Sequence, residues 1–152
     1  MKSGKNWLGI LTLILIFGLS GTAYAQSGAG TFTLTGIPAR FNGMYVLLWA
    51  ENRNVELIGA QNYNLDRDTG TLPRIQNGRV SIPMWIMIDD GRTERLVRYN
   101  GNHTVEVEIE IYKSSRFNDY SEDIAYIYFE RISFSNGSAA ASFQDNDEFD
   151  VY

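Results

Sequence analysis

The sequence contains no cysteine. This absence excludes a disulfide framework, a thiol nucleophile and a lipid-attachment cysteine, and it removes the commonest ligands of structural zinc sites. A zinc ion could be held only by His103, which is the sole histidine, together with carboxylates. We therefore predict no metal ion and no cofactor.

Lysine is also scarce, because the only lysines are Lys2, Lys5 and Lys113. The formal net charge of the whole chain is −5, and it becomes −7 if Lys2 and Lys5 are lost with an export signal. An acidic protein of this kind is a poor partner for nucleic acid or anionic lipid, since both are bound mainly through cationic side chains.

Residues 1–25 have the features of a signal peptide. Lys2 and Lys5 precede an apolar run over residues 7–19, and Ala23 and Ala25 occupy the small positions before a cleavage site. The run is too short for a membrane span, so we expect no stable membrane insertion after cleavage. The prediction is an exported bacterial protein, periplasmic or extracellular, since exported proteins without disulfides are typical of bacteria.

No segment after residue 25 shows a helical stripe of apolar residues, and the pattern is instead one of alternation with a period of two residues. Asn-Gly or Asp-Gly pairs separate many of the alternating runs, which is the strongest local signal for hairpins. We expect a flexible leader (26–30), one β-domain (31–143) and a loose acidic tail (144–152). The expected strands are 31–35, 44–50, 55–60, a weak 72–76, 79–89, 93–99, 103–113, 124–134 and 138–143, with polar loops at 61–70 and 114–123.

The fold class that follows is all-β, a single antiparallel β-sandwich of about eight strands, with a small closed β-barrel as the alternative. The run at 45–49 is apolar on both faces, which favours a central strand of a sandwich. Pro83 cannot donate to a ladder, so its strand should be bulged or lie at an edge. The apolar phase changes between Phe129 and Ile132, which predicts a β-bulge near Glu130.

Glu106, Glu108 and Glu110 alternate with aliphatic residues. Side chains in such a row are about 6.5–7 Å apart, too far to converge easily on one ion. We expect this row to face solvent and to pair with arginines of other strands, for which Arg95, Arg98 and Arg131 are candidates. A glycosidase pair of acids is disfavoured because the three glutamates share one environment.

Other candidate sites are weak. His103 stands beside a turn, where we expect it to be exposed, and no Gly-x-Ser-x-Gly motif accompanies it. Asn64, Asp66 and Asp68 resemble the start of a calcium loop but lack the closing glutamate. No catalytic residues are therefore predicted, and the chain is not expected to be an enzyme.

Aromatic residues supply the remaining functional signal. Tyr45, Trp49, Trp85, Tyr126 and Tyr128 lie in the phase opposite to the predicted core positions. If their strands are neighbours, they form an aromatic patch that could bind a protein, glycan or peptide. Two alternatives stay open: burial of these strands on both faces, and a lipocalin-like carrier whose apolar pocket they line.

The turn and strand signals together resemble a family of small exported β-domains from spirochaetes whose function is uncharacterised. The matching segments are Thr35-Gly36-Ile37-Pro38, Asn42-Gly43-Met44-Tyr45, Asn77 to Trp85 and Asn136 to Phe143. This resemblance implies the fold and the export route and no catalytic residues. The functional prediction is therefore a non-enzymatic binding or structural module of the bacterial envelope or surface, with an unknown ligand.

Overall fold

The computed structural model describes residues 30–118 and 120–152. The predicted signal peptide and all of the predicted leader except Gly30 lie outside these residues. The described chain is built of β-strands with two short 3-10 segments, so the all-β prediction is confirmed. The 3-10 segments are η1 (Ala39–Phe41) and η2 (Phe143–Asp145).

Seven strands form one antiparallel sheet, in the order β13-β11-β9-β2-β3-β7-β8. In this sheet, two pairs of strands that are consecutive in the sequence form hairpins with short turns: β2 with β3, and β7 with β8. The strands are β2 (Tyr45–Asn52), β3 (Val55–Ile58), β7 (Trp85–Asp89), β8 (Glu94–Arg98), β9 (Thr104–Tyr112), β11 (Ala125–Ser133) and β13 (Glu148–Val151).

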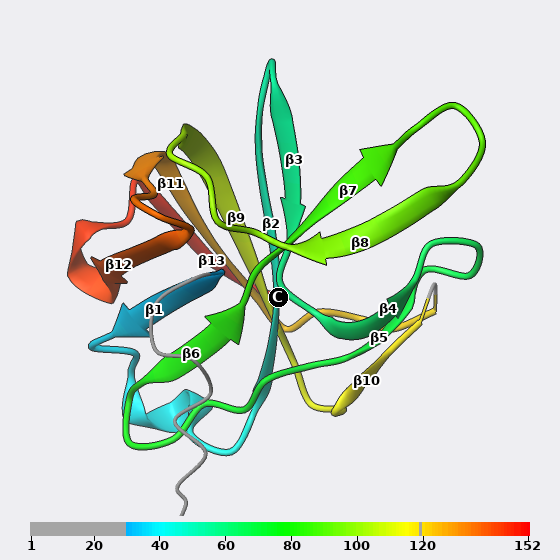
Figure 1. The fold of residues 1–152 in the computed structure, drawn as a ribbon. Coiled ribbons are helices and arrows are strands. Elements are labelled where there is room, and N and C mark those ends of the chain that lie inside the picture. The colour runs from blue at the N-terminus through cyan, green and yellow to red at the C-terminus, as the bar shows by residue number, and fades with distance from the viewer. Residues whose placement is uncertain (1–29, 119) are drawn as a thin grey trace, which may run out of the picture.

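A three-stranded sheet packs on one face of the seven-stranded sheet. Its order is β12 (Ser138–Ser142), β1 (Thr31–Thr35) and β6 (Val80–Pro83), with β1 parallel to β12 and antiparallel to β6. Figure 1 shows these three strands grouped on one side of the larger sheet. None of the sheets closes on itself, so the structure confirms the sandwich rather than the barrel.

The core lies between these two sheets and follows the alternation in the sequence. Leu34 of β1, Ile82 of β6, Leu48 of β2 and Ile109 of β9 have no exposed surface. Phe32 contacts the rings of Phe129 and Phe134, which joins the two layers. We call the face of the seven-stranded sheet that meets this core the inner face, and the opposite face the outer face.

A second three-stranded sheet covers part of the outer face. It consists of β10 (Arg116–Phe117), β5 (Thr69–Thr71) and β4 (Gln61–Asn64), in that order. In Figure 1 it lies on the side of the molecule opposite to β1, β6 and β12. Both segments that we expected to be polar loops therefore contain strands, which their polar composition conceals. Residues 72–76, predicted as a weak strand, make only isolated bridges at Arg74 and Gln76.

The predicted irregularities are present. The pairing of β11 with β9 shifts register between Phe129 and Ile132, which confirms the bulge and turns both side chains to the core. Pro83 lies in β6, an edge strand, as predicted. The expected single strand at 79–89 is instead divided, because the chain passes from β6 to β7 in the other layer through buried Met84.

The prediction of a loose C-terminal tail is wrong. Residues 148–151 form β13, which pairs with β11 at the edge of the seven-stranded sheet. Phe149 of this strand packs against Phe41 and Phe143, with ring centroids 6.1 and 4.9 Å apart. The packing of Phe149 anchors this acidic segment to the fold.

Two Asn-Gly pairs form the tight turns that the sequence predicts. Asn77 and Gly78 have φ values of 52° and 68°, and Asn136 and Gly137 have values of 48° and 76°. Positive φ at both central residues is the signature of the type I′ turn. The flanking residues are bridged, Gln76 with Arg79 and Ser135 with Ser138.

Candidate functional site

The strand register places all five predicted aromatic residues on the outer face. Residues that are directly opposite in adjacent strands share a face of the sheet. Trp49 and Tyr128 are both opposite Glu108, and Tyr126 is opposite Glu110. Tyr45 is opposite Tyr112, and Trp85 is opposite Ile58, which is itself opposite Trp49. All five side chains are half-buried.

The five residues nevertheless do not form one aromatic patch. Tyr45, Trp49 and Trp85 pack with the second small sheet, and Trp49 meets the ring of Tyr63 edge-on at 5.7 Å. Tyr126 and Tyr128 lie on β11, beyond the glutamates of β9. The predicted patch is therefore divided into two parts by a row of carboxylates.

One glutamate of this row, Glu110, accepts a hydrogen bond from a tyrosine hydroxyl. Tyr112 donates to Glu110 over 2.5 Å. Tyr126 and Tyr128 lie diagonally from Glu108 and Glu106 across the β9–β11 ladder, and burial together with these carboxylates raises the pKa of each tyrosine hydroxyl. Glu106 and Glu108 are exposed, whereas Glu110 is half-buried near the second small sheet.

The proton affinities of these groups reflect burial and crowded negative charge. Burial raises the pKa of Glu110, with the carboxylates of Asp123 and Glu108 adding to the effect. Burial and the charge of Glu108 raise the pKa of Tyr126 to about 12. Burial and the hydrogen bond to Glu110 raise the pKa of Tyr112. The tyrosines therefore remain hydrogen-bond donors throughout the physiological pH range.

The expected pairing of the glutamate row with arginines is wrong for Arg95 and Arg98. Three strands separate β8, which carries Arg95 and Arg98, from β9. The guanidinium group of Arg98 instead lies over the ring of Trp85, 5.0 Å from its centroid. On β11 the register partners of Glu110 and Glu108 are Tyr126 and Tyr128 instead of arginines.

A second row of acids crosses the strands, and sequence analysis missed it. Glu51 of β2 is directly opposite Glu56 of β3 on one side and Glu106 of β9 on the other. All three side chains are exposed. Like charges directly opposite in a sheet destabilise it, so this arrangement is unfavourable in isolation. Detecting it requires the order of the strands, which period-two alternation does not reveal.

Both acidic rows border a hollow of about 210 Å³ on the outer face. Its lining is Trp49, Ala50, Glu51, Glu56, Glu106 and Glu108. The hollow therefore combines one half-buried indole ring with four carboxylate side chains. Such a lining can attract a positively charged group both by charge and through the face of the ring.

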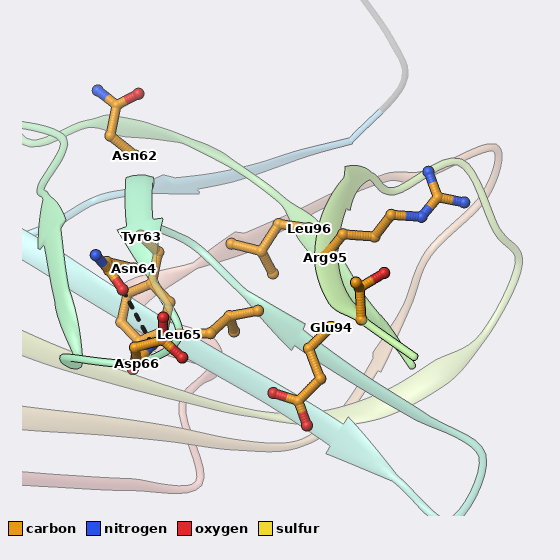
Figure 2. Close-up of a pocket in the computed structure, with 9 residues that line it drawn as sticks. Asn62, Tyr63, Asn64, Leu65, Asp66, Glu94, Arg95 and Leu96 are labelled. Carbon is orange, nitrogen blue, oxygen red and sulfur yellow. Dashed lines mark hydrogen bonds between the residues drawn. The ribbon is translucent and has the colours of Figure 1, made fainter. Parts of the chain in front are cut away.

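A larger and more open groove of about 640 Å³ lies between the β4–β5 turn and β8. Figure 2 shows the side chains of Leu65 and Leu96 directed toward one another across it, with Glu94 and Asp66 at its border, whereas Arg95 points away. The dashed line in Figure 2 is the hydrogen bond of 3.0 Å that the Asp66 amide donates to Asn64 Oδ1.

A small apolar hollow of about 10 Å³ lies between the two. It is lined by Trp49 and Glu56, which also border the acidic hollow, and by Tyr63, Leu65 and Leu96, which also border the groove. The three depressions therefore follow one another across the outer face from β9 to β8. We call this series the outer trough.

The other residues weighed in the sequence have structural partners. His103 is half-buried rather than exposed, and its Nδ1 lies 2.6 Å from the hydroxyl of Tyr99. Tyr63 donates to Asp68 over 2.6 Å, in the segment that resembled a calcium loop. Within residues 30–118 and 120–152, no group of three or more acidic or histidine side chains is arranged to hold a metal ion.

Comparisons of the chain with protein-family models, curated proteins and solved structures give no match. Over the described residues, no helix has the length and apolar character needed to cross a membrane. The resemblance to spirochaete β-domains therefore stays a prediction from the sequence.

Proposed function

We propose that the protein is an exported, non-enzymatic binding module of the bacterial envelope or surface, and that the outer trough is its binding site. The observation that carries this proposal is the hollow beside Trp49. A half-buried indole, which meets the ring of Tyr63 edge-on, and four carboxylates line a depression there. Aromatic rings in a polar depression are typical of binding surfaces.

A binding role also fits the state of the groups that could act in catalysis. Glu110 accepts a hydrogen bond from Tyr112, and Nδ1 of His103 lies 2.6 Å from the hydroxyl of Tyr99. General acid–base catalysis requires a group that is free to exchange a proton with a substrate near neutral pH. We therefore retain the non-enzymatic hypothesis. Export rests on the sequence of residues 1–25 and on the absence of cysteine.

The carrier hypothesis needs an apolar cavity between the layers. The side chains at that interface, such as Leu34, Leu48 and Ile109, have no exposed surface. The hollows described above all lie on the outer face, where their lining is partly charged. An open site for part of a larger partner agrees better with this geometry than a closed site for a small apolar molecule.

Tryptophan fluorescence can test the proposal directly. Trp7 belongs to the predicted signal peptide, so a Trp85→Phe variant of the exported protein carries Trp49 as its reporter, and a Trp49→Phe variant carries Trp85. Each variant would be titrated with chitohexaose, with a soluble basic peptide and with palmitate, and quenched with acrylamide.

We expect acrylamide to quench Trp49 in the free protein, and a hydrophilic probe to protect it in a saturable manner. A response to palmitate alone would favour the carrier. Failure of every probe to change the emission or the quenching of Trp49 would overturn the binding role of the outer trough.

A further inference from the structure

We infer that the hollow beside Trp49 receives the cationic end of an arginine or lysine side chain, presented by an extended peptide segment of a protein partner. This inference rests on the proposed function, because it names the ligand class of the same trough. Its basis is the combination of charge, ring geometry and shape in the hollow.

The charge of the hollow is uncompensated by the strands that build it. Glu51 lies between Glu56 and Glu106, and Trp49 lies between Ile58 and Glu108 in the adjacent register positions. The cross-strand neighbours of Glu51 are therefore carboxylates, where an opposite charge would stabilise the sheet. A cation supplied by a partner would reduce the repulsion among these carboxylates. Relief of that repulsion would contribute part of the binding free energy.

The same outer face already shows how it accommodates a cation. Arg98 places its guanidinium group over Trp85, 5.0 Å from the ring centroid, two strands away from Trp49. Trp49 of β2 and Trp85 of β7 are both opposite Ile58 of β3, but Trp49 borders carboxylates instead of an arginine. An incoming guanidinium or ammonium group would complete the equivalent contact, since indole is the best aromatic partner for a cation.

The size of the site is sufficient for the end of an arginine or lysine side chain. A volume of about 210 Å³ corresponds to about seven water molecules at their share of liquid volume. An apolar depression of about 10 Å³, lined in part by Leu65, Met87 and Leu96, lies between the hollow and the larger groove. A peptide could place its charged side chain at Trp49 and an apolar side chain in the larger groove beside Leu65 and Leu96.

The test uses pairs of probes that differ only in charge. N-acetyl-argininamide would be compared with N-acetyl-citrullinamide, its neutral isostere, and a Leu-Arg-Leu-Leu peptide with Leu-Cit-Leu-Leu. Binding to the exported protein would be followed through the indole N–H signal of Trp49 in a nitrogen-15 NMR spectrum, assigned with the Trp85→Phe variant.

We expect the arginine probes to shift this signal in a saturable manner and the citrulline probes to bind about fivefold more weakly, as loss of a charge pair at a partly exposed site implies. Glu108→Gln and Glu56→Gln should each weaken the arginine peptide by about threefold to fivefold. Glu122→Gln removes one charge from an exposed position away from the trough and should have little effect.

Glu51→Gln gives a second and independent readout. It should raise the melting temperature, because a like-charge contact is removed on both sides of β2, and it should also weaken arginine binding. Replacement of a residue whose side chain stabilises the fold would lower the melting temperature instead of raising it.

Equal binding of the arginine and citrulline peptides would overturn the inference while leaving the binding function intact. Lack of response to all four probes would overturn it as well, and the glycan probe described above would then decide whether the trough binds anything. Equal effects of Glu108→Gln and Glu122→Gln would show that net charge, and not the hollow, attracts the cation.

Discussion

Tyr112 and Glu110 lie two positions apart on the same face of β9, with the tyrosine hydroxyl 2.5 Å from Oε2 of the carboxylate. The pair is enclosed by Phe117 of the second small sheet, whose ring centroid is 5.7 Å from that of Tyr112. A hydrogen bond of this length to a half-buried carboxylate ties the glutamate row to the covered end of the outer face.

The raised pKa of Glu110 predicts a pH dependence of stability. Burial disfavours the ionised carboxylate, so the fold holds the proton of Glu110 more strongly than the unfolded chain does. The stabilisation that comes from this retained proton is fully present below the pKa that Glu110 has in the unfolded chain. It is lost as the pH rises through the higher pKa that Glu110 has in the folded protein. Glu110→Gln should therefore be more stable than the wild type by about 0.5–1 kcal/mol at pH 7, the scale of a like-charge contact.

Urea denaturation at pH 3.5 and pH 7 would measure this difference. The gap between the Glu110→Gln variant and the wild type should narrow at the lower pH, where the carboxyl group is protonated in both states. The same gap at both pH values would show that ionisation of Glu110 does not affect the fold.

The C-terminal strand should contribute to stability through Phe149. Its ring packs on Phe41 and Phe143, and it is half-buried. Phe149→Ala should cost about 2 kcal/mol, below the roughly 3–5 kcal/mol of a fully buried phenylalanine. Val151→Ala is the matched control, because Val151 lies on the same strand with 54% of its surface exposed. Similar unfolding midpoints for the two variants would contradict the packing of β13.

Gly59 should tolerate no side chain. A Cβ atom at this position would lie 2.5 Å from Cγ2 of Ile82 and 2.9 Å from Cβ of Leu48, in the contact between the two layers. Gly59→Ala should therefore destabilise the protein by about 1–3 kcal/mol, as overpacking of a core does. Thermal unfolding would measure the loss. An unchanged melting temperature would mean that the layers are farther apart at β3 than described.

Arg98 should protect Trp85 from solvent. Because its guanidinium group covers the indole ring, Arg98→Met should lower the stability by about 0.5–1 kcal/mol, the scale of an exposed cation–π contact. In a Trp49→Phe background, the emission of Trp85 should move to longer wavelength. Arg95→Met is the control, since Arg95 is an exposed residue of the same strand. Equal emission shifts for the two variants would show that Arg98 does not shield the ring.

Much of the local structure was predictable because alternation is a property of each extended segment. Thr31–Thr35 was predicted with its observed bounds, and the bulge between Phe129 and Ile132 followed from the change of apolar phase. Strands β4, β5 and β10 were missed because their residues are polar and their segments short. Their pairing depends on the outer face that they cover, which no local pattern encodes.

The candidate site was predictable only in part. The phase of Tyr45, Trp49, Trp85, Tyr126 and Tyr128 indicated a face opposite to the core, and the register places all five there. The division of these residues by glutamates was not predicted. Neither was the role of Arg98, because the partner of a side chain across a sheet depends on strand order.

The amino-acid sequence by itself determined the all-β class, the tight turns at Asn77-Gly78 and Asn136-Gly137, and the side of each long alternating strand that meets the core. These features follow from backbone geometry and from side chains a few residues apart. Only the tertiary structure decided that Glu56, Glu51 and Glu106 stand in line beside Trp49. Strand order is set by packing between segments distant in the chain, so it alone could bring these carboxylates together around one hollow.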